Sequence, residues 1–169
     1  MKTVTKTEAQ NMLDAGRISS SYFKKKYTIL MPKEAAQNWL DALRSGEYIQ
    51  SAMVLHNPTT GGFCCLGVEQ YCNNDGYVEN NYKSDKDKNG NFLGYPTIGY
   101  QQERGYLFVD ADNCKTGNPA LRKGRTANLN DSTYEVKKKV NQYATKKVKL
   151  HTNDFAKMAD YLEEVMLVY

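Results

Sequence analysis

The sequence has no long apolar run and no export signal. Its opening residues, M-K-T-V-T-K, lack the apolar stretch that a signal peptide requires. No segment approaches the ~18 consecutive apolar residues of a membrane helix. We therefore expect a cytoplasmic protein that has no membrane partner and whose four cysteines are reduced thiols.

Common metal-binding and nucleotide-binding motifs are also missing. Cys64, Cys65, Cys72 and Cys114 include no C-x-x-C pair, so their spacing does not favour a structural zinc site. The patterns G-x-x-x-x-G-K-[ST], G-x-G-x-x-G and H-E-x-x-H do not occur. We predict neither a metal nor a cofactor.

Length and composition indicate one domain with a modest core. A chain of 169 residues fits a single domain, 1–169, that can bury roughly 70% of its unfolded surface. The hydrophobic fraction is 40%, the mean hydropathy is −0.71, and there are 13 tyrosines. Tyrosine combines a rigid ring with a hydrogen-bonding tip, which suits recognition surfaces and ordinary strand packing equally.

Positive charge is in slight excess, with a net charge of +4. Lysines form two runs, at 24–26 and 137–139, and further lysines stand at 146, 147 and 149. The pI of about 8.7 is below the value of ~9 that nucleic-acid-binding domains usually exceed. We interpret these runs first as solvated faces, and keep binding to small anionic molecules or nucleic acid as alternatives.

Four segments have helical patterns. A capping box formed by Thr5 and Glu8 predicts a short N-terminal helix. Pro32, followed by apolar residues at helical spacing, predicts a helix at 33–44. We also predict helices at 66–73, leaving a strand, and at 153–166, where an apolar stripe docks on the core.

The remaining segments predict short strands and polar loops. Strands are expected at 48–55 and 106–109, and the turn residues at 57–62 predict a hairpin. Residues 22–31 form a connector or a strand, and 110–132 are loop-like. The stretch 73–105 is polar, and residues 83–91 within it have too few apolar residues to be ordered by packing, so they form an exposed loop or a hairpin tip. We predict an α+β domain: a small antiparallel sheet flanked by three or more helices, with a long polar loop insertion at about 73–105.

Ten residues form the expected core. They occupy the apolar positions of the predicted helices and strands. These residues are Trp39, Leu40, Leu43, Phe63, Leu66, Val68, Phe108, Phe155, Met158 and Leu162.

Cys65 is a candidate nucleophile, because a thiolate is stabilised where a strand enters a helix. The string F-C-C-L-G-V is similar to F-D-C-S-G-L-V around the nucleophile of NlpC/P60-type cysteine peptidases, although Cys64 and Leu66 depart from that pattern. His151 follows in the chain as the base that a hydrolase needs, and either Asn153 or the pair Asn130-Asp131 could orient it. The alternative, which we favour, is that both adjacent cysteines are buried core residues.

A basic segment is a second candidate site. Arg122 and Arg125 precede an L-N-D segment that contains Asn130 and Asp131. The two arginines could hold a phosphate together with backbone N–H groups. The favoured alternative is a structural turn, because Asn and Asp bond their own backbone.

Two blocks of sequence resemble a group of small bacteriophage and prophage proteins. The blocks are W-L-x-A-L-R-S-G-E-Y-x-Q, from Trp39 to Gln50, and G-F-C-C-L-G-V at 62–68. The group has the pattern W-x-x-A-L-R-S-G-x-Y-x-Q followed by F-C-C-L-G-V, and it closes with L-N-D and F-x-x-I-A-x-x-I-E. Residues 129–131 and 155–163 resemble the closing pieces, but here residues 132–154 separate them. The resemblance implies a phage origin and action in the cytoplasm of an infected bacterium.

The first block also offers a possible ligand site. Arg44 is the last residue of the predicted helix 33–44, and Tyr48 and Gln50 lie in the predicted strand 48–55 that follows it. They could form a pocket wall that meets an anionic or planar ligand. The alternative is that they belong to the framework of the fold.

Our leading hypothesis is a phage accessory protein that counters host defence by binding. Its partner would be a small anionic ligand, such as a nucleotide-like signalling molecule that it sequesters, or a host protein that it inhibits. Small size and the lack of a complete catalytic set favour binding over turnover. The alternatives are a cysteine hydrolase that uses Cys65 and His151, and a nucleic-acid-binding protein that uses the lysine runs.

Overall fold

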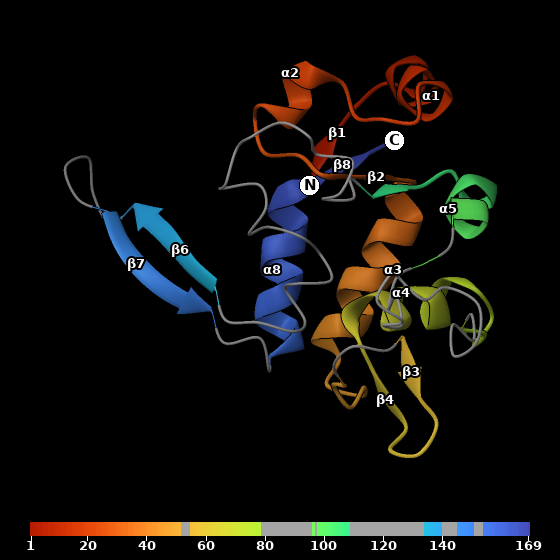
Figure 1. Cartoon of the computed structure of the whole chain (residues 1–169), viewed down its shortest axis with the longest axis vertical. Helices are drawn as coiled ribbons and strands as arrows, with labels where there is room; N and C mark the ends of the chain where they lie inside the picture. Colours follow the sequence, from red (N-terminus) through yellow and green to blue (C-terminus); the bar gives the residue numbers. More distant parts are fainter. Residues whose placement is uncertain (52–54, 79–95, 97, 109–133, 140–144, 151–153) are drawn as a thin grey trace, which may run out of the picture.

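The computed structural model describes residues 1–51, 55–78, 96, 98–108, 134–139, 145–150 and 154–169, with 134–139 and 145–150 described as backbone. Helices lie on both sides of a four-stranded sheet, so the body has three layers (Figure 1). The α+β class is confirmed. Among the described residues, no helix is long and apolar enough to cross a membrane.

The four-stranded sheet is mixed, which corrects the prediction of an antiparallel sheet. It contains β1 (Lys2–Thr3), β8 (Met166–Val168), β2 (Ile29–Met31) and β5 (Leu107–Phe108), in that order. Strand β8 runs parallel to both β1 and β2, and only β5 is antiparallel to its neighbour. Parallel pairing needs a long crossover, and the helices between β2 and β8 provide it.

Alternation along β2 and β8 divides the core between the two faces of the sheet. Ile29, Met31 and Met166 pack into the larger cluster with the helices below the sheet in Figure 1. Leu30 and Leu167 face the opposite way, into a smaller cluster with the N-terminal segment. All six residues of the two strands are buried, as expected for strands covered on both faces.

The N-terminal layer consists of α1 (Lys6–Asp14) and α2 (Ser20–Phe23). The predicted capping box is confirmed: the Thr5 hydroxyl accepts from the Glu8 N–H at 3.2 Å, and the Glu8 carboxylate accepts from the Thr5 N–H at 2.9 Å. The segment 22–31, left open between connector and strand, contains the end of α2 and all of β2.

The other layer contains α3 (Lys33–Arg44), α4 (Cys65–Asn73), α5 (Ile98–Arg104) and α8 (Phe155–Val165). The prediction for 33–44 is confirmed. Helix α4 begins one residue earlier than predicted, because Cys64 serves as its N-cap. The predicted helix 153–166 ends at Val165, because Met166 is the first residue of β8. Strand β8 forms its backbone hydrogen bonds with β1 and β2 instead of continuing the helix.

Several predictions for the middle of the chain need correction or fall outside the described residues. Within the expected strand 48–55, Gln50 forms an isolated bridge with Phe63, and the hairpin pairs β3 (His56–Asn57) with β4 (Gly62–Phe63). Helix α5 stands where a polar loop was predicted, because its tyrosine packs into the core. Strands β6 (Tyr134–Lys139) and β7 (Thr145–Leu150) were not predicted. The loops expected at 79–95 and 110–132 lie outside the described residues.

Trp39 lies at the centre of the larger core cluster. It is fully buried, its Nε1 donates to the Cys65 carbonyl oxygen at 2.8 Å, and its ring meets Phe108 edge to face at 6.2 Å. One residue of α3 thus contacts both α4 and the sheet. The ten predicted core residues are all buried, which confirms that prediction.

Truncating Trp39 should therefore destabilise the whole body. We expect Trp39→Ala to lower the free energy of unfolding by about 3–5 kcal/mol, because it removes a large aromatic from a packed core. Trp39→Phe keeps a ring but loses the hydrogen bond, and should cost about 1–3 kcal/mol. Urea denaturation measures both. The exposed Lys33→Ala on the same helix is the control, and a Trp39→Ala protein as stable as this control would contradict the packing described.

Candidate functional site

The start of α4 places the two adjacent cysteines inside the protein. Cys64 caps the helix, and its Sγ accepts a hydrogen bond from the Gly67 N–H at 3.4 Å. Cys65 is the first helical residue, and its exposed fraction is 0%. The strand-to-helix position predicted for Cys65 is confirmed, but a nucleophile must meet its substrate, and this thiol lies in the core.

The Leu55 backbone packs directly on this first turn. A Cβ atom on Gly67 would lie 1.7 Å from the Leu55 carbonyl oxygen, so only glycine permits the approach. The same carbonyl oxygen accepts from the Cys64 N–H at 3.2 Å. The space beside the first turn of α4 is thus filled by the chain itself.

The catalytic pair Cys65 and His151 stays a prediction. His151 and its proposed partner Asn153 lie outside the described residues. The other histidine of the chain, His56, stacks on Phe63 with ring centroids 4.4 Å apart. In the part of the chain with described side chains, no group of three or more His, Cys, Asp or Glu residues is placed to hold a metal ion.

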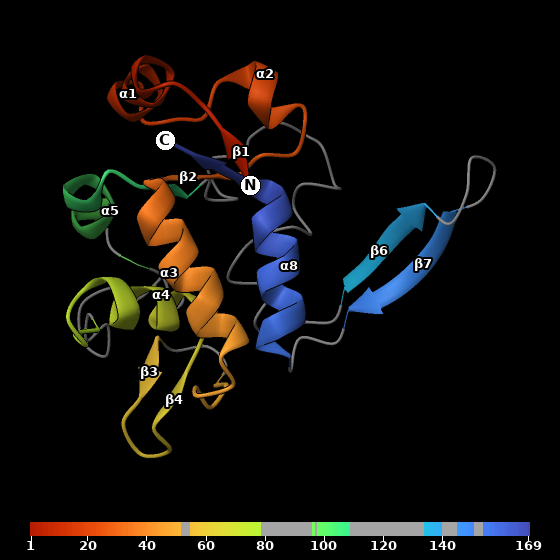
Figure 2. The same cartoon turned by 180° about the vertical axis from the view of Figure 1, so that it is seen from behind.

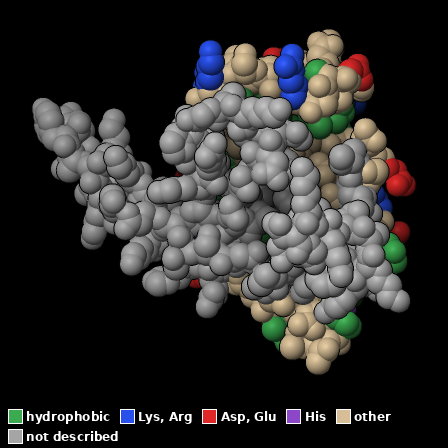
Figure 3. Space-filling view, viewed as in Figure 1, with side chains coloured by type: hydrophobic (Ala, Val, Ile, Leu, Met, Phe, Trp, Pro, Cys, Tyr) green, Lys and Arg blue, Asp and Glu red, His purple; other side chains and the backbone are tan. Residues whose placement is uncertain are grey.

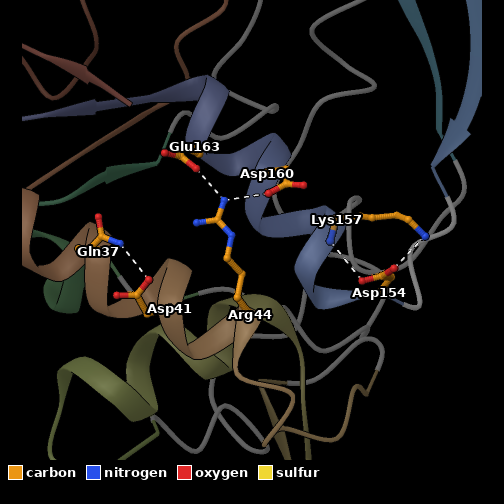
Figure 4. Close-up of polar contacts among 7 residues, drawn as sticks. All are labelled: Gln37, Asp41, Arg44, Asp154, Lys157, Asp160 and Glu163. Atoms are coloured by element: carbon orange, nitrogen blue, oxygen red, sulfur yellow. Dashed lines mark hydrogen bonds and ion pairs between the residues drawn. The ribbon is translucent and has the colours of Figure 1, made fainter.

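Arg44 joins α3 to α8 through two carboxylates. One guanidinium nitrogen, Nη2, donates to Asp160 at 2.8 Å and to Glu163 at 2.6 Å (Figure 4). These hydrogen bonds, the one to Glu163 first, raise the pKa of Arg44 above its ordinary value. Because two negative charges already face this guanidinium, an anionic ligand would have to displace them.

Tyr48 and Gln50 lie beside β4, away from the Arg44 ion pairs. The Tyr48 ring meets Phe63 edge to face at 5.6 Å and Tyr71 at 5.9 Å, and burial raises the pKa of its hydroxyl. Gln50 bridges to Phe63 through the backbone. The structure therefore brings Tyr48 and Gln50 together on Phe63 while the Arg44 guanidinium contacts α8. The remaining predicted ligand residues lie outside the described residues: Arg122, Arg125, Asn130 and Asp131.

Exposed apolar residues border this Tyr48–Phe63 cluster. Among the residues with described side chains, the large hydrophobic ones left exposed are Ile49 (62%), Tyr77 (61%) and Tyr71 (40%). Ile49 follows Tyr48, Tyr71 packs on Phe63 at 5.2 Å, and Tyr77 follows the turn that closes against the Tyr71 ring. We refer to Ile49, Tyr71 and Tyr77 as the aromatic surface. Figure 3 shows hydrophobic side chains at the lower end of the molecule, where Figure 1 has the β3–β4 hairpin.

A buried carboxyl group lies on the other side of α4. Glu69 has an exposed fraction of 0%, and its Oε1 accepts from Asn73 Nδ2 at 3.2 Å and from the Tyr100 hydroxyl at 3.4 Å. Burial raises the pKa of Glu69 from 4.5 to about 7, although hydrogen bonds from Asn73, Tyr106 and Tyr100 oppose the shift. Glu69 thus keeps its proton to a much higher pH than an ordinary carboxyl group does.

Helix α5 and the segment after it complete this polar network. Arg104 donates to the Asn73 carbonyl oxygen at 2.6 Å and to the Asn74 side chain, and its guanidinium lies 5.7 Å from the Tyr100 ring centroid. Burial, followed by the nearby Glu69 charge, raises the pKa values of Tyr100 and Tyr106. Burial also raises the pKa of the Cys72 thiol to about 12, so this thiol stays protonated. The network ties α4 to α5.

Sequence reasoning missed this network. The run C-L-G-V at the start of α4 is apolar on every side, which indicates a helix buried all round. That signal implied that the next residues, Glu69 and Gln70, would be buried as well. Tyr100, the partner of Glu69 on α5, fell in a stretch that composition alone assigned to a polar loop.

Glu69 should make stability depend on pH. The folded state holds its proton up to a pKa of about 7, whereas the unfolded state releases it near 4.5. The stabilisation is therefore complete below pH 4.5 and is lost as pH rises through 7. We expect a loss of roughly 2–3 kcal/mol between pH 5 and 8, at about 1.4 kcal/mol per pKa unit.

Urea unfolding of Glu69→Gln at pH 5 and pH 8 measures this contribution. Glutamine keeps the size but cannot ionise, so the variant should lack the Glu69 part of the pH dependence and gain stability relative to wild type as pH rises. Glu34→Gln, on the exposed face of α3, is the matched control. Equal pH dependence in wild type and Glu69→Gln would contradict the assignment.

Comparison with known proteins gives one family. Residues 31–166 match the model described as "Domain of unknown function (DUF8296)". No curated protein matches the chain, and no solved structure does. The match runs from the last residue of β2 to the first residue of β8, so it includes α3, α4, the aromatic surface and the buried Glu69. Because it covers most of the sequence, the chain belongs to the DUF8296 family.

Proposed function

We propose that the protein acts by binding another protein, and that the aromatic surface is its binding face. Ile49, Tyr71 and Tyr77 expose large apolar side chains beside one cluster of packed rings. Tyrosine is enriched at protein interfaces and at the residues that dominate binding energy. The rings beneath this surface are fixed by edge contacts, so little conformational entropy is lost when a partner covers it.

A protein partner suits this face better than a nucleotide does. A phosphate-bearing ligand needs a cation beside the rings that stack on its base. Arg44 already pairs with two carboxylates on α8, and Arg104 bonds the C-terminal end of α4. The aromatic surface presents the large apolar side chains of Ile49, Tyr71 and Tyr77. The core of a protein–protein interface buries apolar area of this kind.

The structure at the start of α4 also favours a binding function over a hydrolytic one. The candidate nucleophile Cys65 is buried, and the Leu55 backbone fills the space beside it. A cysteine hydrolase would need this segment to move before a substrate could reach the thiol.

The resemblance to phage proteins supplies the context of the proposal. The two blocks of the resemblance meet in space: Trp39 bonds the Cys65 carbonyl, and Gln50 bridges to Phe63. Together they build the support on which the aromatic surface rests. We therefore propose that the partner is a host protein of an infected bacterium, and that covering its surface blocks a defence function.

Capture from bacterial lysate tests the proposal. A tagged wild-type protein should retain one host protein in stoichiometric amount. Ile49→Asp and Tyr77→Ser should each weaken this capture at least tenfold, about 1.4 kcal/mol, because they remove exposed contacts near the centre of the surface. Asn11→Asp, an exposed change on α1 that adds the same charge as Ile49→Asp, should leave capture unchanged.

Calorimetry against nucleotides and cyclic dinucleotides distinguishes protein binding from the rival hypothesis, in which the protein sequesters a nucleotide-like signalling molecule. We expect no heat from any of them. A nucleotide that binds with Tyr77-dependent affinity, in the absence of a captured protein, would instead establish a small-molecule sequestering function. Capture that survives both surface variants would show that the aromatic surface is not the binding face.

A further inference from the structure

Strands β6 and β7 bring two separate lysine runs together. The antiparallel register pairs Lys137 with Lys147 and Lys138 with Lys146, and Glu135 stands opposite Lys149. Like charges directly opposite in neighbouring strands are destabilising. A bound anion would relieve the repulsion in two such successive pairs.

The charge of the chain is concentrated in this ribbon. Its twelve strand residues include six lysines and one glutamate, a net charge of +5. The whole chain has a net charge of +4, so the remaining 157 residues together have a net charge of −1. The overall pI therefore understates the basic character of this one element.

The lysines stand on both faces of the ribbon. Because successive strand residues alternate between faces, Lys137, Lys139 and Lys147 share one face, and Lys138 and Lys146 share the other. These five residues form the half of the ribbon next to the connection between the strands. The other half contains the apolar residues Tyr134, Val136, Val148 and Leu150.

The ribbon stands apart from the body of the protein. Figures 1 and 2 both show β6 and β7 projecting beyond α8, away from the sheet. Among the described elements, these two strands contact each other far more than they contact any other element. The contacts of the ribbon backbone are thus mainly those between its own two strands.

We propose that the β6–β7 ribbon is an arm that docks into a groove of duplex nucleic acid. The major groove of B-DNA is about 12 Å wide and admits a two-stranded β-ribbon. Strands of six residues extend about 20 Å, which spans several phosphates. Lysines on both faces fit phosphates that flank the ribbon on both sides, whereas a flat membrane surface would neutralise one face only.

This inference goes beyond the proposed protein-binding function and is independent of it. The ribbon and the aromatic surface share no residue. Loss of nucleic-acid binding would leave capture of a host protein intact, and the reverse also holds. The two proposals can therefore fail separately.

Fluorescence anisotropy with a labelled 24-base-pair DNA duplex tests the arm. Four phosphate contacts predict a slope of log K against log salt of about −3.6, which is roughly a hundredfold loss of affinity between 50 and 200 mM salt. The test variant replaces Lys137, Lys138, Lys146 and Lys147 by Gln. It should bind at least ~10-fold more weakly at 50 mM salt, with the slope reduced by about 3 to 4.

Matched variants keep the result specific. The control replaces four exposed basic residues of the body, outside the 24–26 run, by Gln: Lys6, Arg17, Lys33 and Lys157. It lowers net charge by the same amount and should keep most of the affinity. A second variant, with Arg at the four ribbon positions, retains the charge and should retain both affinity and salt slope. Circular dichroism with thermal unfolding shows that each variant is folded.

Three results would overturn the proposal. One is no duplex binding at 50 mM salt. Another is an equal loss in the body control, which would make the binding a net-charge effect. The third is preference for another anionic partner, either single-stranded DNA or vesicles of anionic phospholipid, over the duplex. Tighter duplex binding that depends on the ribbon lysines supports it.

Discussion

The close packing of α4 against α3 and the Leu55 backbone determines what the rest of the structure can do. It depends on two features, the Trp39 hydrogen bond to the Cys65 carbonyl and the contact that Gly67 permits. Because α4 is buried from its first turn, both adjacent cysteines and Glu69 lie in the interior. The hairpin and the rings around Phe63 are then left at the surface, where binding can occur.

The sequence predicted those elements whose signals are local. The helix 33–44 has an apolar period, a proline at its start and a glycine after its end, so its bounds could be predicted. The central strand β8 could not be predicted, because Met166 continues the apolar stripe of α8. Its strand conformation comes from pairing with β1 and β2, which lie more than 130 residues away in the chain. The mixed character of the sheet has the same non-local origin.

The candidate sites also divide into features that have a local sequence signal and features that depend on residues distant in the chain. Tyr48 was predicted as a site residue and lies beneath the aromatic surface, whereas the Arg44 partners on α8 could not be anticipated from its own segment. Tyr100 was missed because α5 is ordered by packing rather than by its own composition. The lysine runs were interpreted as solvated faces, and only the β6–β7 register reveals that the 137–139 run meets Lys146 and Lys147 in one ribbon.

The central claim is that the F-C-C-L-G-V segment is a buried framework of the fold. Alkylation by iodoacetamide at pH 7, with each cysteine followed by mass spectrometry, tests it most directly. We predict that Cys64 and Cys65 remain unmodified in the native protein and react fully once it is unfolded in urea. Rapid, selective alkylation of native Cys65 that disappears in His151→Ala would contradict the account and establish a thiolate nucleophile with its base.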